Sequence, residues 1–433
     1  MRTRVAIEGV HKLEYEIRHI VPIGRRIQSM GVPMTWENIG DPIAMGEKVE
    51  PWIREAVQSL VNDDVSWAYS PTQGMEATRE FICHQRSLDG GVKISPSDIL
   101  FVNGIADAVD KIYDLVRKDA RIIMPTPCYP THSSNESKRG NYDCLFFRLD
   151  PRKGWEPDLD ELRCKVKYNP QVVGIAFVNP DNPTGYTYPP AVISEIVEIA
   201  RQYGLFIICD EIYTHICYNG AKPTHLSSYI GDVPAIAIRG ISKEYPWPGA
   251  RCGWMEFYNA GRDPDFNLYV KAIIDSKMME VCSTTLPQMS IPKVMGDARY
   301  GPHLQRRAAM FERRSREACD AFRAVEGVVI NPTTGAFYFP VVFEDGLLNN
   351  RQTLPIPNPA LRAMIEDLVK DVRNDKRFVY YLMASAGVCV TPLSGFHSDL
   401  TGFRMTLLET DDAKRRDTLR RLAQAIPAYI ASA

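Results

Sequence analysis

Short apolar runs alternate with helical patterns through the middle of this chain, and this alternation constrains the fold more than any other feature. The runs are continuously apolar, which is typical of strands covered on both faces. Helical stretches between successive strands favour crossover connections, so we predict an α/β fold with a mostly parallel sheet flanked by helices. Binding sites are then expected at the carboxyl ends of the strands. The runs span residues 99–103, 121–124, 144–149, 172–178, 205–209 and 236–239, and the helical stretches span 105–117, 159–166 and 191–203.

After about residue 300 the pattern changes to a long helix, shorter strands and a final helix. A length of 433 residues also favours two domains. We therefore predict a large α/β domain over residues 46–300 and a smaller α+β domain that combines residues 1–45 with 301–433. Within the latter, residues 343–359 are rich in Asn, Pro and Gly and are predicted to form an exposed loop insertion. The small-domain elements are expected at residues 304–325, 336–342, 388–391, 403–408 and 411–430.

Composition excludes several classes of protein. A net charge of −2 offers no field for nucleic acid or an anionic membrane. The ten cysteines include no CxxC pair and the eight histidines lack metal-ligand spacing, so we expect reduced thiols and no metal site. No apolar stretch approaches the ~20 residues that span a bilayer, and no apolar signal-peptide core follows the N-terminus. We expect a cytoplasmic protein that binds neither membranes nor nucleic acid.

One segment combines a lysine with groups that suit a phosphate. Ser242 and Lys243 are followed eight residues after the lysine by Arg251, with turn-forming Pro and Gly residues between them. A lysine that forms an imine must lose its charge, and a phosphate needs cationic and hydroxyl partners nearby. The segment resembles the Ser-Lys…Gly-x-Arg-x-Gly signature of class I/II, fold type I aminotransferases that depend on pyridoxal 5'-phosphate. The resemblance implies that Lys243 binds the cofactor covalently and is catalytic.

Two polar turns follow predicted strands in the order found in that family. Asp210 comes directly after an apolar strand, where a carboxylate needs a fixed cationic partner. An ordinary helix cap would also explain it. The resemblance assigns Asp210 to the pyridinium nitrogen of the cofactor. It assigns Tyr213, and Asn182 from the Asn-Pro-Asp-Asn-Pro-Thr-Gly turn, to the phenolic oxygen.

A third turn joins a predicted strand to a helix, whose N-terminal amides can bind phosphate. The resemblance places the cofactor phosphate on Gly104, Ile105 and Ala106 of this turn. Many relatives carry Ser or Thr at the position of Ala106, so one phosphate contact is expected to be missing. Tyr129, in a proline-rich turn, matches the aromatic residue that stacks on the cofactor ring. Tyr69 matches a tyrosine that reaches the phosphate of the neighbouring subunit, which implies a homodimer with shared active sites.

The substrate side of the site rests on three further residues. Arg404 lies within a predicted apolar strand near the C-terminus, and Arg presents a fork of donors that fits a carboxylate. A buried Arg is more often half of a structural ion pair, but in the family this Arg holds the substrate α-carboxylate. Tyr15 and Gly40 match substrate-pocket positions of the alanine aminotransferase-like branch, although a packed helix and a turn explain them equally well.

The resemblance, which covers roughly residues 13–409, implies transamination between an α-amino acid and a 2-oxo acid by a ping-pong mechanism. The same residues serve β- and γ-elimination on this fold, so an elimination or replacement enzyme of specialised biosynthesis stays open as the alternative. Glu244, directly after the lysine, is less usual than a small polar residue at that position. The motifs identify neither the amino donor nor the acceptor.

Overall fold

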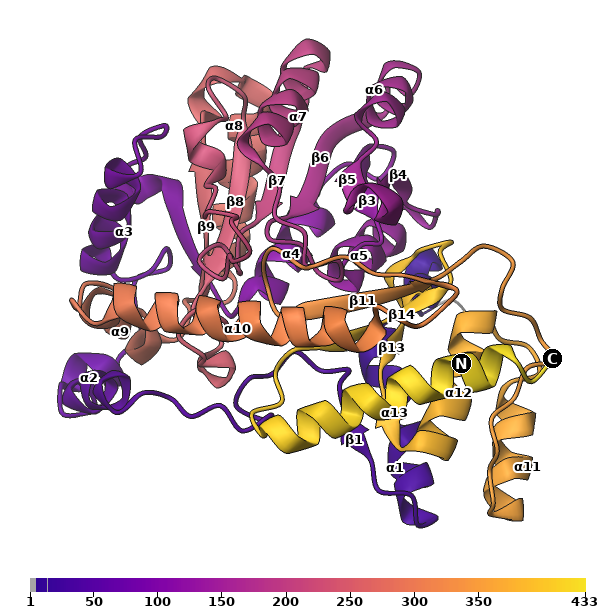
Figure 1. Ribbon diagram of the computed structural model, residues 1–433. Helices are drawn as coiled ribbons and strands as arrows, with labels where there is room; N and C mark the ends of the chain where they lie inside the picture. The colour runs from indigo at the N-terminus through magenta and orange to yellow at the C-terminus, as the bar shows by residue number, and fades with distance from the viewer. Residues whose placement is uncertain (1–4, 14) are drawn as a thin grey trace.

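The structure is a computed structural model that describes residues 5–13 and 15–433. Of the segment 1–45 assigned to the small domain, residues 1–4 and 14 lie outside the described residues. The described chain forms a large and a smaller main sheet with helices packed around them, as Figure 1 shows.

The largest sheet among the described residues has eight strands in the order β2-β9-β8-β7-β6-β3-β4-β5. Its five central strands, from β8 to β4, pair in parallel, while β2, β9 and β5 add antiparallel edges. The predicted mostly parallel α/β sheet is confirmed. The strands are β2 (Ile99–Val102), β3 (Arg121–Thr126), β4 (Leu145–Asp150), β5 (Glu156–Pro157), β6 (Val172–Val178), β7 (Phe206–Asp210), β8 (Ala235–Gly240) and β9 (Gly253–Tyr258).

Helices cover both faces of this sheet, which explains why its strands read as continuous apolar runs. In β7, Ile207 and Cys209 pack in the same core as α6 (Leu159–Lys167) and α7 (Pro190–Tyr203). The intervening Ile208 packs on the opposite face, with α4 (Ile105–Leu115) and α8 (Pro264–Met278). Successive side chains of a strand point to opposite faces, so each face has its own apolar cluster.

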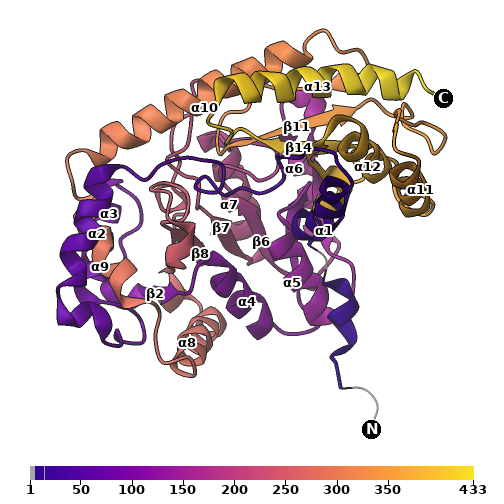
Figure 2. The same cartoon turned by 90° about the horizontal axis from the view of Figure 1, so that it is seen from below.

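A smaller antiparallel sheet, in the order β10-β11-β14-β13, lies beside the large one. Its strands are β10 (Val328–Val329), β11 (Tyr338–Phe343), β14 (Gly402–Thr406) and β13 (Thr391–Pro392), and β1 (Thr35–Trp36) pairs with β12 (Val388–Cys389). The 23-residue helix α10 (Tyr300–Phe322) and α13 (Asp412–Ile430) run side by side over this part in both Figure 1 and Figure 2. Three further helices complete it: α1 (Glu16–Ser29), α11 (Pro359–Leu368) and α12 (Asn374–Ala386).

The segment predicted to be an exposed insertion, residues 343–359, is an irregular and largely exposed loop that also buries several side chains. Between β11 and α11 the chain has no helix or strand, so the loop is confirmed. More than half of its residues are exposed, but Leu348, Leu354 and Ile356 are buried in the core of the smaller sheet and Gln352 is 1% exposed. The Asn, Pro and Gly content correctly predicted an irregular backbone. It did not indicate that apolar residues of this loop pack into the core.

The remaining helices pack at the far end of the large sheet, where Figure 2 shows α2, α3 and α9 as neighbours. They are α2 (Pro51–Val61), α3 (Glu76–Leu88) and α9 (Thr285–Met295); α5 (Pro130–Gly140) follows β3. No helix in the described part of the chain is long and apolar enough to cross a membrane.

Candidate active site

A cavity of about 590 Å³ opens at the carboxyl ends of the parallel strands. Side chains reach it from the ends of β6 and β7, from the turns after β3 and β8, and from β11 and β14 of the smaller sheet. It therefore lies where a parallel sheet is expected to bind a ligand. Among the residues predicted for the site, those lining the cavity are Tyr15, Gly40, Ile105, Ala106, Tyr129, Asn182, Asp210, Tyr213, Ser242, Lys243, Arg251 and Arg404.

Lys243 is half-buried in this cavity. Its Nζ donates a hydrogen bond of 2.5 Å to the carbonyl oxygen of Gly40. Burial, aided by the positive charges of Arg404 and Arg251, lowers the pKa of this amine from 10.5 to about 8. The lysine is thus partly neutral near physiological pH, as a nucleophile or proton carrier must be.

Asp210, at the carboxyl end of β7, is 1% exposed and has one carboxylate oxygen without a hydrogen bond. Its Oδ1 accepts a hydrogen bond of 3.1 Å from the backbone N–H of Ile212. Its Oδ2 lies 3.6 Å from Nε2 of His132, which also has no hydrogen-bond partner. A buried carboxylate with a free oxygen is costly unless a bound cationic group completes it.

Arg404, on β14, is 1% exposed, and no ion pair among the described residues includes it. Its guanidinium donates to Oδ1 of Asn182 at 3.0 Å and to the carbonyl of Asn38, and it lies 4.3 Å above the ring of Tyr338. Its Nε has no partner, and burial lowers its pKa. Arg404 is therefore not half of a structural ion pair in the described chain, and it leaves a donor for an anion.

Tyr213 points toward the same place from the turn after β7. Its hydroxyl lies 2.9 Å from that of Tyr338, and burial raises the pKa of both phenols. Both side chains are therefore neutral hydrogen-bonding groups at physiological pH.

The predicted phosphate turn is brought next to its predicted arginine. Gly104 has a φ of +82°, and a Cβ added there would lie 2.5 Å from an Nη atom of Arg251. Only glycine lets the guanidinium approach this closely. Ile105 and Ala106 begin α4 at the cavity wall, so their free N–H groups and the dipole of α4 face the same side as Arg251.

Two aromatic contacts close the other side of the cavity. The hydroxyl of Tyr15 lies 3.1 Å from that of Tyr129, with the rings edge to face. Gly40 is also required by packing, because a Cβ there would lie 2.2 Å from the hydroxyl of Tyr338. These contacts explain why the two N-terminal positions reach the cavity at all.

Tyr69 does not line this cavity. It is 84% exposed and projects from the loop before α3, next to Trp67, which is 77% exposed. Its prediction as a residue that serves another subunit stays untested within a single chain.

Several polar side chains at the site were not predicted from the sequence. Arg18 and Asp41 line the cavity, as does Tyr338, and His132 lies behind Asp210. Arg18 and Asp41 stand within stretches already noted around Tyr15 and Gly40. His132 begins a run of polar residues in α5 that is almost entirely buried, but a sequence does not reveal burial.

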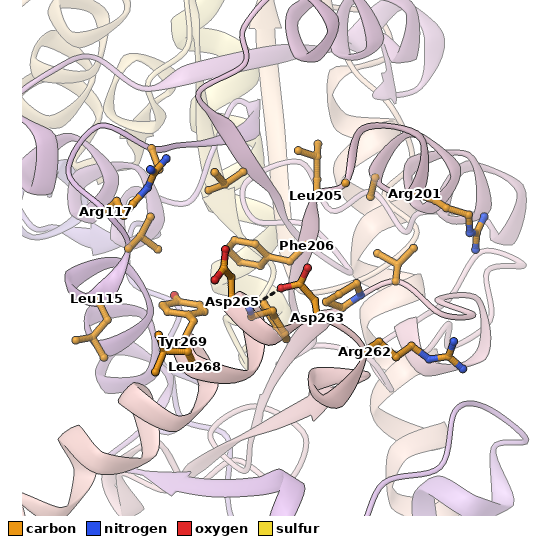
Figure 3. A pocket seen from close by; sticks show the side chains of 18 of the residues that line it. Leu115, Arg117, Arg201, Leu205, Phe206, Arg262, Asp263, Asp265, Leu268 and Tyr269 are labelled. Atoms are coloured by element: carbon orange, nitrogen blue, oxygen red, sulfur yellow. Dashed lines mark hydrogen bonds between the residues drawn. The ribbon is translucent and has the colours of Figure 1, made fainter.

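A second hollow, of about 1000 Å³, lies at the opposite, amino ends of the same strands. Figure 3 shows Phe206 and Tyr269 at its centre, with Arg117 on one side and Arg201 and Arg262 on the other. No predicted site residue lines it. Within residues 5–13 and 15–433, no group of three or more His, Cys, Asp or Glu side chains is arranged to hold a metal ion.

Comparison with known proteins defines the class to which this fold and site belong. Residues 38–422 match the family of class I and II aminotransferases. The chain belongs to this family, and it is an enzyme that transfers amino groups. The fold is that of the fold type I enzymes, with a large, mostly parallel sheet and a smaller α+β part.

Individual relatives agree with this class. An uncharacterized aminotransferase of Methanocaldococcus jannaschii is 48% identical over 99% of this chain and 100% of its own length. The glutamate-pyruvate aminotransferase AlaA of Escherichia coli is 29% identical over 78% of this chain and 83% of its own length. The solved alanine aminotransferase of Pyrococcus furiosus superposes with a TM-score of 0.84 at 25% identity, covering 98% of this chain and 99% of that one.

Proposed function

We propose that the chain is a pyridoxal 5'-phosphate-dependent transaminase whose catalytic lysine is Lys243. The observation that carries this proposal is a half-buried lysine with a pKa of about 8, in a cavity that also presents an unpartnered oxygen of Asp210 and an unpaired Arg404. These groups are costly to bury alone and are complementary to a cationic ring nitrogen and an anionic carboxylate.

The residues present fit the cofactor. The N-terminus of α4, together with Arg251 and Ser242, would hold the phosphate, and Tyr129 would pack on the ring. Asp210 would pair with the ring nitrogen, and Tyr213 and Asn182 would hydrogen-bond the phenolic oxygen. When bound, the cofactor supplies an electron sink for charge that develops on the substrate Cα. Ala106 has a backbone amide but no side-chain hydroxyl for the phosphate, as expected from the sequence.

The chain's own groups then bind the substrate and move the proton. Arg404 would orient an α-amino acid or 2-oxo acid by its carboxylate, in two parallel hydrogen bonds. The neutral amine of Lys243 would carry the proton to and from the substrate Cα. The amino group passes to the enzyme in one half-reaction and to a second 2-oxo acid in the other, which is a ping-pong mechanism.

Arg18 would influence which substrate binds. It is exposed at the cavity wall, so a donor with a second carboxylate could reach it. The relatives are named for alanine and for glutamate with pyruvate. We therefore propose glutamate and alanine as the first donors to test. An Arg18→Gln variant should raise the KM for glutamate about tenfold and leave that for alanine nearly unchanged.

An exposed apolar surface supports the proposed homodimer. Trp67 and Tyr69 are joined through Ala68 and Ser70 to the segment 283–285, which follows the exposed Met278, Met279 and Val281. Large exposed apolar side chains gathered in this way are typical of interfaces.

We also propose a cytoplasmic location and a division into two domains, one of residues 46–300 and one of residues 1–45 with 301–433.

The half-reaction tests the function most simply. The cofactor absorbance of the purified holoenzyme is followed while single amino acids are added, and the products are analysed. Conversion to pyridoxamine phosphate with release of the matching 2-oxo acid is expected. Release of ammonia with pyruvate would indicate elimination instead, which the aminotransferase names of the relatives do not favour. Unchanged absorbance with every amino acid would contradict both.

A further inference from the structure

Glu244, directly after the lysine, points away from the cavity and is 7% exposed. Its Oε1 accepts a hydrogen bond of 3.0 Å from the backbone N–H of His215 and lies 2.8 Å from Nδ1 of the same residue. Its Oε2 accepts from the hydroxyl of Tyr300 at 3.1 Å. Burial alone would raise the pKa of this carboxyl, but its contacts with His215, together with the charge of Arg239, lower the pKa to about 2.

One face of α10 holds the main chain at the same point. Arg307 donates to the carbonyl oxygens of both Lys243 and Glu244, and Nε2 of His303 lies 3.1 Å from the latter. Tyr300, His303 and Arg307 are spaced by three and four residues, so they share that face of the helix. Arg307 is fixed in turn by two hydrogen bonds, of 2.6 and 3.0 Å, to Glu47.

The His215 contact ties the lysine to the rest of the site. His215 follows β7 in the turn that begins with Asp210 and carries Tyr213. The side chain of Glu244 therefore bridges the loop that bears Lys243 and the turn that bears the two groups proposed to hold the cofactor ring. A serine or threonine hydroxyl is too short to span the same gap.

We infer that Glu244 is a positioning residue, which sets the amine of Lys243 relative to Asp210 and Tyr213 through its bridge to His215. The inference rests on the proposed function, since it concerns the reaction of the same lysine. A catalytic group displaced by about 1 Å loses on the order of 100-fold in rate. A merely structural ion pair would instead change stability and leave the rate of the folded enzyme unchanged.

Kinetics separate these two roles. In the holoenzyme, Glu244→Gln keeps the volume and one acceptor and should lower kcat about 10-fold, and Glu244→Ala should lower it about 100-fold. KM should change less than about threefold, because Arg404 is untouched. Glu312→Gln, which removes a carboxylate paired with Arg316 on the same helix, is the matched control and should behave as wild type. Glu244→Gln keeps the test valid if the alanine variant does not fold.

A double variant tests the bridge itself. If Glu244 acts through His215, Glu244→Gln combined with His215→Asn should be about as slow as the slower single variant. Hydrogen exchange of the apoprotein gives a readout without cofactor, and segments 211–216 and 241–250 should both exchange faster in the variants. Additive losses in kcat, or a fall in melting temperature with kcat unchanged, would overturn the inference. A wild-type enzyme that transaminates no amino acid would contradict the proposed function instead, and the exchange data would still show whether Glu244 holds the two segments together.

Discussion

In the two segments that carry Asp210 and Lys243, some side chains face the cavity and others face away from it. The two sets differ in how completely their polar groups are hydrogen-bonded. On the cavity side, Asp210 has an oxygen without a hydrogen bond, and the amine of Lys243 donates its one hydrogen bond within the described chain to the carbonyl of Gly40. On the opposite side, the next residue in each segment is a buried glutamate with fixed partners. Glu211 pairs with Arg239 and accepts the backbone N–H of Leu226, and Glu244 is bridged to His215 and Tyr300.

This difference separates two tasks of neighbouring residues. Asp210 ends strand β7, where adjacent side chains point in opposite directions, and the bend after β8 likewise directs Lys243 into the cavity and Glu244 away from it, so one residue can face a ligand while the next is fixed in the protein. The cavity side tolerates unsatisfied groups because a ligand completes them, and the opposite side supplies the stability that offsets them. The side chains of the cavity face should therefore control activity, and those behind them should control stability and alignment.

The largest expected effect is on the cavity side. Lys243→Ala should lower turnover by at least about 10⁴-fold, because no other lysine of the described chain lines the cavity. The melting temperature should not fall, since the variant removes a cation that burial disfavours. Steady-state kinetics and thermal unfolding of the same preparation measure both quantities. Substantial remaining transaminase activity would exclude the proposed role of the lysine.

The next prediction compares two adjacent carboxylates, one on each side. Asp210→Asn should lower kcat about 100- to 1000-fold, with little change in the free energy of unfolding. Glu211→Gln should lower the free energy of unfolding and change kcat little, because it leaves Arg239 buried beside a neutral group. Breaking a buried ion pair in this way costs about 3–5 kcal/mol of the free energy of unfolding.

Urea unfolding and kcat are measured for both variants. Glu256 also lies 3.2 Å from Nε of Arg239 and should limit the loss in Glu211→Gln to the lower end of that range. Equal losses of stability in the two variants would remove the distinction between the two sides.

The pH dependence of cofactor uptake tests the perturbed lysine. Burial lowers the pKa of Lys243 to about 8, so the folded apoenzyme holds a protonated, unreactive amine below that pH. The rate of reconstitution with pyridoxal phosphate should rise about tenfold per pH unit up to 8 and then level off. Stopped-flow absorbance measures this profile. A rate that keeps rising to pH 10 would show a lysine with an ordinary pKa.

The smallest effect concerns packing at the cavity wall. Gly40→Ala places a Cβ 2.2 Å from the Tyr338 hydroxyl and should lower kcat/KM about 10-fold by displacing Tyr338 or the backbone that holds Lys243. Tyr338→Phe removes the clashing oxygen, so the double variant should recover part of the loss. The kinetics of the three variants show whether the loss in Gly40→Ala comes from this contact. If it came from a general loosening of the cavity wall, the double variant would recover no activity.

The sequence predicted the parallel core of the fold because its strands are covered on both faces and read as apolar runs. It did not predict β9, whose residues follow the turn at Arg251, or α5, where buried polar residues such as Ser133 and Glu136 hide a helix. Most of the residues that the motifs single out line one cavity. Arg18 and Tyr338 were missed because they enter the cavity through tertiary packing. The buried side chains within the largely exposed loop at 343–359 were missed because burial depends on partners distant in sequence.

The central claim is that Lys243 binds the cofactor covalently, and chemical trapping tests it most directly. The holoenzyme is reduced with borohydride, digested and examined by mass spectrometry. The account predicts one reduced pyridoxyl group on the peptide that contains Lys243, and none on that peptide in Lys243→Ala. A pyridoxyl group on a different lysine of the wild-type protein, or none at all, would contradict it.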